Sequence, residues 1–105
     1  MTENKTYQVI VSDRAKRMLG VHIRFMAQVN KEAAAVKKKE IMAAMRSLSQ
    51  MPQRFPFFEE LYMPPNKYHK MFIEKYYLVL YQIQDNTVYV EYILDCRKDY
   101  SWLIR

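Results

Sequence analysis

The stretch Tyr76–Ile83, with the sequence YYLVLYQI, decides the fold, because it is apolar at nearly every position. Such a run suits a strand that is buried on both faces and therefore lies in the middle of a sheet. Asp85-Asn86 follows as a turn signal, and Thr87–Leu94 alternates as the next strand. Tyr68–Lys75 precedes the run as a further strand, and the short connections predict an antiparallel meander. Alternation places four apolar side chains of the last strand on one face: Val88, Val90, Tyr92 and Leu94.

The N-terminal half predicts one strand and two helices. Tyr7–Val11 is β-branched and aromatic, as strands are, and Ser12 is placed to cap a helix that runs to about Asn30. A second helix is predicted over Lys31–Gln50, and Pro52 stops it. The short joint between the helices predicts a helical hairpin.

The element order β-α-α-β-β-β predicts an α+β fold, in which the hairpin packs on one face of an antiparallel sheet. The other face is expected to stay available. Residues 52–66 contain four prolines and several aromatic residues, so they are expected to form a loop that packs on the body. Gly20 lies off the buried stripe of the first helix and costs about 1 kcal/mol relative to Ala. Residues 1–105 are expected to form a single domain.

Composition excludes several classes of protein. One cysteine excludes a disulfide framework and a multi-cysteine zinc site, and one glycine excludes a phosphate-binding loop of several glycines. The longest apolar run, Tyr76–Tyr81, is far shorter than the about 20 residues that span a bilayer. The first residues lack the basic-then-apolar pattern of a signal peptide, so none is expected. His22 and His69 are too far apart in sequence to suggest a metal motif. We expect a cytoplasmic protein with no membrane segment, metal or cofactor.

The positive charge is confined to the first half of the chain. Residues 1–52 contain ten Lys and Arg against four acids, a net charge of +6, whereas residues 53–105 contain seven of each. A basic surface attracts an acidic partner, either nucleic acid or an acidic protein segment. The alternative is a solvated face that keeps a small protein soluble.

Two histidines and a basic tail could carry chemistry. His22 lies on the apolar stripe of the first helix, which favours a packed, hydrogen-bonded side chain over a ligand. His69 stands between Lys67 and Lys70 and could act as a general acid or base, or it could be an ordinary strand residue. In the tail, two cations and a phenol follow the last strand: Arg97, Lys98 and Tyr100. Arg97 can bind a phosphate or a carboxylate through two hydrogen bonds, and Lys98 adds a point charge. Asp95 and Asp99 bracket these cations, so a local clamp is the alternative.

Four segments together resemble the RelE/ParE superfamily of small bacterial toxins from type II toxin–antitoxin modules, often labelled plasmid stabilisation proteins. They occur in the family's order and span nearly the whole chain: YQVIVSDRAK at Tyr7–Lys16, LSQMPQRFP at Leu48–Pro56, YLVLYQI at Tyr77–Ile83 and ILDCRKDY at Ile93–Tyr100. The resemblance implies a toxin that stops growth when it is released from an acidic antitoxin, with which it forms a hetero-oligomer. It also implies the same β-α-α-β-β-β fold.

The superfamily divides by target. RelE-like members cleave messenger RNA in the ribosome, whereas ParE-like members poison DNA gyrase. The cationic positions of the RelE-type second strand fall on His69 and Met71 here, and the Arg that follows the strand Tyr falls on Leu78. A position that is often His in the family is Asp95. These departures favour a ParE-like inhibitor of gyrase.

A metal-independent endoribonuclease is the alternative function. Its predicted catalytic residues are His69, Arg97, Lys98 and Tyr100. For either target, the predicted nucleic-acid-binding or target-binding residues are Lys67, Lys70, Arg97 and Lys98. A further alternative is a nontoxic basic interaction module that has kept the fold.

Overall fold

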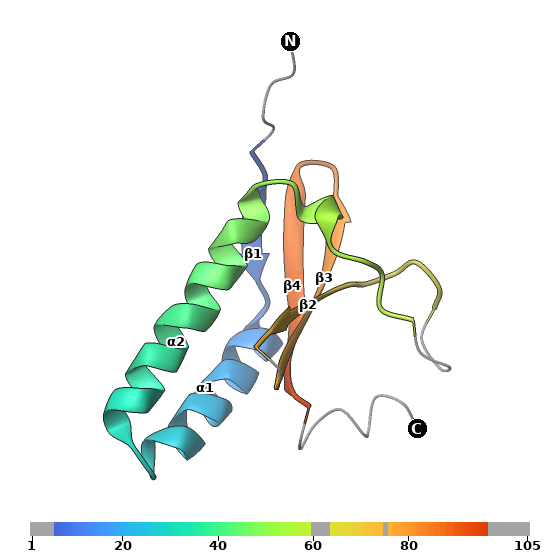
Figure 1. Cartoon of the computed structure of the whole chain (residues 1–105). Coiled ribbons are helices and arrows are strands. Elements are labelled where there is room, and N and C mark those ends of the chain that lie inside the picture. The colour runs from blue at the N-terminus through green and yellow to red at the C-terminus, as the bar shows by residue number, and fades with distance from the viewer. Residues whose placement is uncertain (1–5, 60–63, 75, 97–105) are drawn as a thin grey trace.

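Two helices and a four-stranded sheet make up the part of the chain that the computed structural model describes, residues 6–59, 64–74 and 76–96 (Figure 1). The elements follow in this order: β1 (Gln8–Val11), α1 (Asp13–Ala27), α2 (Lys31–Arg46), the 3-10 turns η1 (Ser47–Ser49) and η2 (Pro52–Arg54), β2 (His69–Ile73), β3 (Tyr77–Gln84) and β4 (Thr87–Asp95). The predicted α+β class and the predicted order β-α-α-β-β-β are therefore confirmed.

The four strands are arranged in the order β1-β4-β3-β2. β3 pairs antiparallel with both β2 and β4, as the predicted meander requires, and lies inside the sheet. β1 instead pairs parallel with β4, with Gln8 opposite Thr87. The prediction of a purely antiparallel sheet is thus wrong at this edge, and the sheet is mixed. The directions of the other strands were predicted from the short connections between them. No short turn joins β1 to β4, so the direction of β1 could not be predicted in this way.

Side-chain caps fix where the two helices begin. The Ser12 hydroxyl accepts a hydrogen bond from the Ala15 amide at 3.0 Å, and the Asn30 side chain accepts one from the Ala33 amide at 3.0 Å. Both oxygens satisfy amides that the first helical turn leaves without a partner. The predicted helix starts are confirmed, but α1 ends at Ala27 and α2 ends at Arg46, where the chain tightens into η1.

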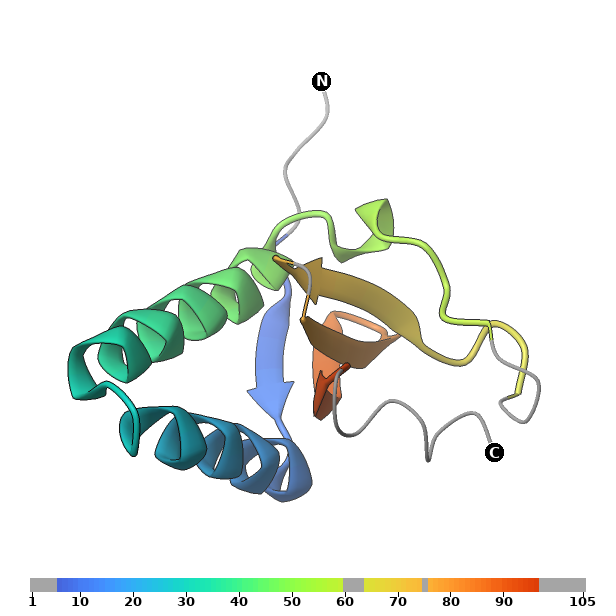
Figure 2. The same ribbon diagram turned by 60° about the horizontal axis from the view of Figure 1, so that its bottom comes forward.

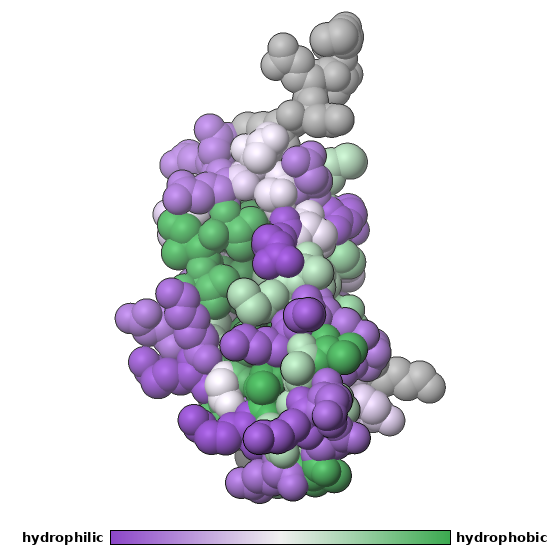
Figure 3. Space-filling model, turned by 90° about the vertical axis from the view of Figure 1, so that its left-hand side faces the viewer, coloured by the Kyte–Doolittle hydropathy of each residue, from purple (hydrophilic) through white to green (hydrophobic). Residues whose placement is uncertain are grey.

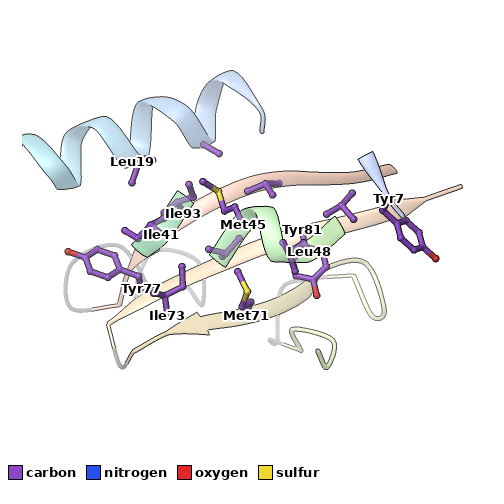
Figure 4. Close-up of a cluster of buried hydrophobic side chains, with 14 residues drawn as sticks. Tyr7, Leu19, Ile41, Met45, Leu48, Met71, Ile73, Tyr77, Tyr81 and Ile93 are labelled. Carbon is purple, nitrogen blue, oxygen red and sulfur yellow. The ribbon is translucent and has the colours of Figure 1, made fainter. Parts of the chain in front are cut away.

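The main core lies between the helical hairpin and one face of the sheet, which we call the helix face (Figure 2). Leu19 from α1 and Ile41 and Met45 from α2 pack against strand residues such as Val79 and Ile93. Figure 4 shows how these side chains converge from both helices and from the strands. Their burial supplies the main stabilisation of the hairpin on the sheet.

A β-bulge interrupts β4 and exchanges the two faces of the strand. Leu80 pairs with Tyr92 and Tyr81 pairs with Val90, so Glu91 is the extra residue. Val90 therefore packs in the core on the helix face, whereas Tyr92 packs on the opposite face. The prediction that Tyr92 and Leu94 share the face of Val90 is wrong for this reason.

The opposite face of the sheet, called here the second face, carries its own small core. Phe58 and Tyr68 cover Leu78, Leu80 and Leu94. The Phe58 amide donates to the Tyr68 carbonyl at 2.7 Å, which ties the proline-rich segment to the start of β2. The predicted packing of this segment is confirmed at Phe58, which is 2% exposed. The prediction that the second face stays available is wrong at its centre.

Candidate functional site

A groove of about 520 Å³ opens between α1, α2 and the end of β1. Nine described residues line it, and they are mostly apolar: Val11, Lys16, Leu19, Gly20, Ile23, Arg24, Lys38, Met42 and Met45. Figure 3 faces the helical side of the molecule and shows a hydrophobic patch bordered by hydrophilic residues. We call the groove lined by these nine residues the hairpin groove.

Helical spacing explains how the sequence builds the hairpin groove. Lys16, Gly20 and Arg24 follow one another at intervals of four residues, so they form one row along α1. Lys38 and Met42 have the same interval on α2 and form the row on the other side. The hairpin groove therefore has an apolar floor and a cation on each helical wall.

The hairpin groove has a strongly one-sided charge. Three of its nine described lining residues are cations and none is an acid. Lys37, one residue before Lys38, does not line the groove and instead forms ion pairs. Its ammonium lies 2.8 Å from a carboxylate oxygen of Glu40 and also contacts Glu74. Desolvation by burial alone would lower the pKa of Lys37, but the two carboxylates outweigh it and raise that pKa. The hairpin groove therefore suits a ligand with an apolar centre and acidic groups at its edges, because those groups would meet the three cations that line the groove.

His69 lies on the helix face and is 9% exposed. Its Nδ1 lies 2.8 Å from the carbonyl oxygen of Phe55, to which it donates. The imidazole lies between two aromatic rings, with centroid distances of 4.3 Å to Phe57 and 5.3 Å to Tyr81. The Tyr81 hydroxyl donates to the Pro52 carbonyl at 2.7 Å, and burial raises the pKa of this phenol. These contacts hold the segment after η1 against β2 and β3.

The two predicted lysines of this region do not join His69. Lys67 is exposed, with its ammonium 5.3 Å from the centroid of the Tyr68 ring. Lys70 follows His69 in β2 and so projects from the second face. Its amide donates to the Pro56 carbonyl at 2.9 Å. The remaining predicted site residues, Arg97, Lys98 and Tyr100, lie outside the described residues, so their roles stay predictions.

Arg14 is a cation of the second face that sequence reasoning missed. Its Nη1 donates to the Tyr92 hydroxyl at 2.7 Å, and its guanidinium carbon lies 4.3 Å from the centroid of that ring. Its Nη2 lies 3.8 Å from a carboxylate oxygen of Glu91, and Glu91 is the bulge residue of β4. No local pattern could have joined Arg14 to Tyr92, which is 78 positions away in the sequence. The hairpin groove was also missed, although the eight-residue spacing of Lys16 and Arg24, which places both cations on one row of α1, was a usable signal.

In the described part of the chain, no group of three or more His, Cys, Asp or Glu side chains is placed to hold a metal ion. None of the helices in this part combines the length and the apolar character that a membrane crossing needs.

Comparison with known proteins identifies the family. The profile described as "ParE toxin of type II toxin-antitoxin system, parDE" matches residues 9–100. A chain from the solved structure titled "Chromosomal ParDE TA system from P. aeruginosa" superposes with a TM-score of 0.71 at 12% sequence identity, over 87% of this chain and 97% of that chain. At this identity the structural match shows a shared fold. No curated protein matches the sequence. The predicted RelE/ParE resemblance is thus confirmed, and the chain is a toxin of a type II toxin–antitoxin module that belongs to the ParE family.

Proposed function

We propose that this toxin acts in the cytoplasm, where it inhibits DNA gyrase without cleaving nucleic acid. We further propose that its antitoxin silences it by placing an acidic, amphipathic segment in the hairpin groove. ParE-like toxins are the gyrase-directed branch of the superfamily that the sequence resembles, and family membership supports this choice over the RNA-cleaving branch.

The observation that carries the non-catalytic proposal is the apolar centre of the second face. Leu78, Leu80 and Leu94 are each 0% exposed, and Phe58 and Tyr68 pack over them. Cleavage of a ribose phosphodiester needs an acid, a base and a cation arranged around one phosphate. Hydrocarbon side chains supply none of these groups, so the middle of this face offers no place for that reaction.

The geometry of His69 supports the same proposal. A general base needs a ring nitrogen within hydrogen-bond reach of the substrate. The imidazole of His69 is instead buried on the helix face, covered by Phe57 and Tyr81 and bound to a backbone carbonyl. This is the environment of a histidine that fixes a loop to a sheet.

The hairpin groove supports the antitoxin part of the proposal. A segment with an apolar residue every three or four positions would cover the floor formed by Leu19, Ile23 and Met45. Aspartate or glutamate residues along the edges of this segment would meet the cations on the helical walls of the groove. Because such a segment is acidic, it would fold only when the groove neutralises and buries it.

Supercoiling assays test the proposal. Purified toxin should inhibit the supercoiling of relaxed plasmid by gyrase, and expression in cells should break DNA while the ends of messenger RNA stay unchanged. The antitoxin encoded beside the toxin should protect gyrase from the wild-type toxin. It should protect poorly against Lys38→Glu, which reverses a charge in the hairpin groove, and fully against the control Lys39→Glu, which lies outside it.

Two outcomes would overturn the proposal. Cuts within translated codons, with gyrase unaffected, would establish the endoribonuclease and direct attention to Arg97, Lys98 and Tyr100. Harmless expression in the absence of any antitoxin would favour a nontoxic interaction module.

A further inference from the structure

A single glycine stands in the middle of α1. Gly20 is the eighth of the fifteen residues of this helix, and it is exposed. Among the common residues, only proline is less favourable than glycine in a helix interior, because glycine gains the most freedom on unfolding. A glycine at such a position is therefore expected to have a compensating use.

The fold itself gives no reason for Gly20. Its backbone is helical, and no glycine of the described residues has a positive φ. A Cβ atom built on Gly20 meets no atom of a neighbouring element within 4 Å. Alanine would thus fit here without a clash, and the missing side chain brings no two elements of this chain closer together.

The position of Gly20 in the hairpin groove supplies the reason. Gly20 lines this groove, one helical turn from Lys16 and one turn from Arg24 on the same row. Any side chain at position 20 would project between these two cations. With glycine, the middle of the α1 wall is bare backbone that a partner can touch.

We propose that Gly20 is the point of closest approach for the antitoxin segment, and that it selects a helix that packs tightly against α1. This inference rests on the function proposed for the hairpin groove. The distance between packed helices depends on the side chains at their contact, so glycine allows the closest packing. A helix seated there would present a small residue to Gly20.

The same geometry defines the charges of the partner helix. Four residues of a helix span about 6 Å, so Lys16 and Arg24 lie about 12 Å apart along the axis of α1. A helix packed along α1 would meet both cations with carboxylates that are about eight residues apart in its own sequence. The small residue that contacts Gly20 would stand midway between these carboxylates.

Binding and unfolding measurements on the same variants test the inference. The toxin variants would be titrated with the full-length antitoxin encoded beside the toxin, at fixed salt, by calorimetry. Gly20→Ala should raise the melting temperature of the free toxin by a few degrees, since alanine is the better helix former. The same change should weaken antitoxin binding about tenfold, and Gly20→Leu should weaken it about a hundredfold or more. The control Ala43→Leu also enlarges an exposed helical residue, but outside the groove, and should leave the affinity within about threefold of wild type.

The outcomes separate this inference from the proposed function. If Gly20→Ala and Gly20→Leu bind like wild type while Lys38→Glu binds weakly, the groove is used but the inference about Gly20 is overturned. If Lys38→Glu also binds like wild type, the antitoxin does not use the groove and both proposals fail. A lower melting temperature for Gly20→Ala would reveal an intramolecular role for the glycine and would overturn the inference as well. If Gly20→Leu does not fold, Gly20→Ala alone decides.

Discussion

His22 Nε2 lies 2.9 Å from the carbonyl oxygen of Ile93, and His69 Nδ1 lies 2.8 Å from that of Phe55. The role of His22 was predictable, because its place on an apolar helical stripe shows which way the side chain points. The environment of His69 was not predictable from sequence. Its polar neighbours suggested an exposed site, but the aromatic rings that cover it come from a loop and from the neighbouring strand. Local pattern determines the direction of a side chain but not what tertiary packing places beside it.

A single substitution separates a structural His69 from a catalytic one. Asparagine keeps an N–H donor near the position of Nδ1 but has no group that titrates near neutral pH. We expect His69→Asn to keep growth inhibition and to lower the stability only modestly, because the Phe55 carbonyl retains a donor. His69→Ala leaves that carbonyl unsatisfied and should cost about 1–3 kcal/mol of unfolding free energy. Denaturant titration and growth assays measure both effects. A stable His69→Asn variant without toxicity would contradict the structural role.

Among the elements, β4 shows where periodicity fails. Its residues alternate correctly from Val88 to Val90, and the bulge at Glu91 then shifts every later side chain to the opposite face. The sequence contains no glycine there to signal the irregularity. The strands and helices themselves were predictable because their apolar periods and caps are local. The bulge was not, because it depends on how β4 pairs with β3.

The segment that follows η2 is predicted to hold the second face in place through one side chain. Phe58 fills the small core there, so Phe58→Ala should cost about 3–5 kcal/mol of unfolding free energy. Phe72 also belongs to the sheet but is 51% exposed, so Phe72→Ala serves as the control and should cost less than about 1 kcal/mol. Urea titration of both variants measures the difference. Equal losses would show that the segment contributes little to the stability of the sheet.

At the scale of the whole molecule, the sequence showed which half of the chain carries the positive charge, but it did not show which surface these charges form. The excess of six positive charges in residues 1–52 belongs to the half that contains both helices. The hairpin groove combines residues of α1, α2 and β1, and only the packing of these three elements brings Lys16, Arg24 and Lys38 around one apolar floor. The parallel pairing of β1 was hidden for the same reason, since both features depend on contacts between distant segments.

Because the hairpin groove has both cations and apolar side chains, we expect two separate effects on the kinetics of antitoxin binding. Salt should change the association rate, and loss of apolar contact should change the dissociation rate. Exposed charges steer the encounter, and salt screens them, since the Debye length falls from about 10 Å at 0.1 M to about 3 Å at 1 M. Raising the salt concentration should therefore slow association strongly and change dissociation little, as stopped-flow mixing can measure. Lys38→Glu should slow association and flatten its salt dependence.

Met42→Ala provides the complementary variant, because it removes apolar contact from the groove but leaves its charge unchanged. We expect this change to speed dissociation by about tenfold while the salt dependence of association stays that of wild type. Association that is insensitive to salt would show that the +6 net charge plays no part in capturing the antitoxin. An unchanged dissociation rate for Met42→Ala would show that the bound segment makes no apolar contact with the α2 wall of the groove. Only a partner that contacts both the cations and the apolar lining of the groove produces the two effects in separate variants.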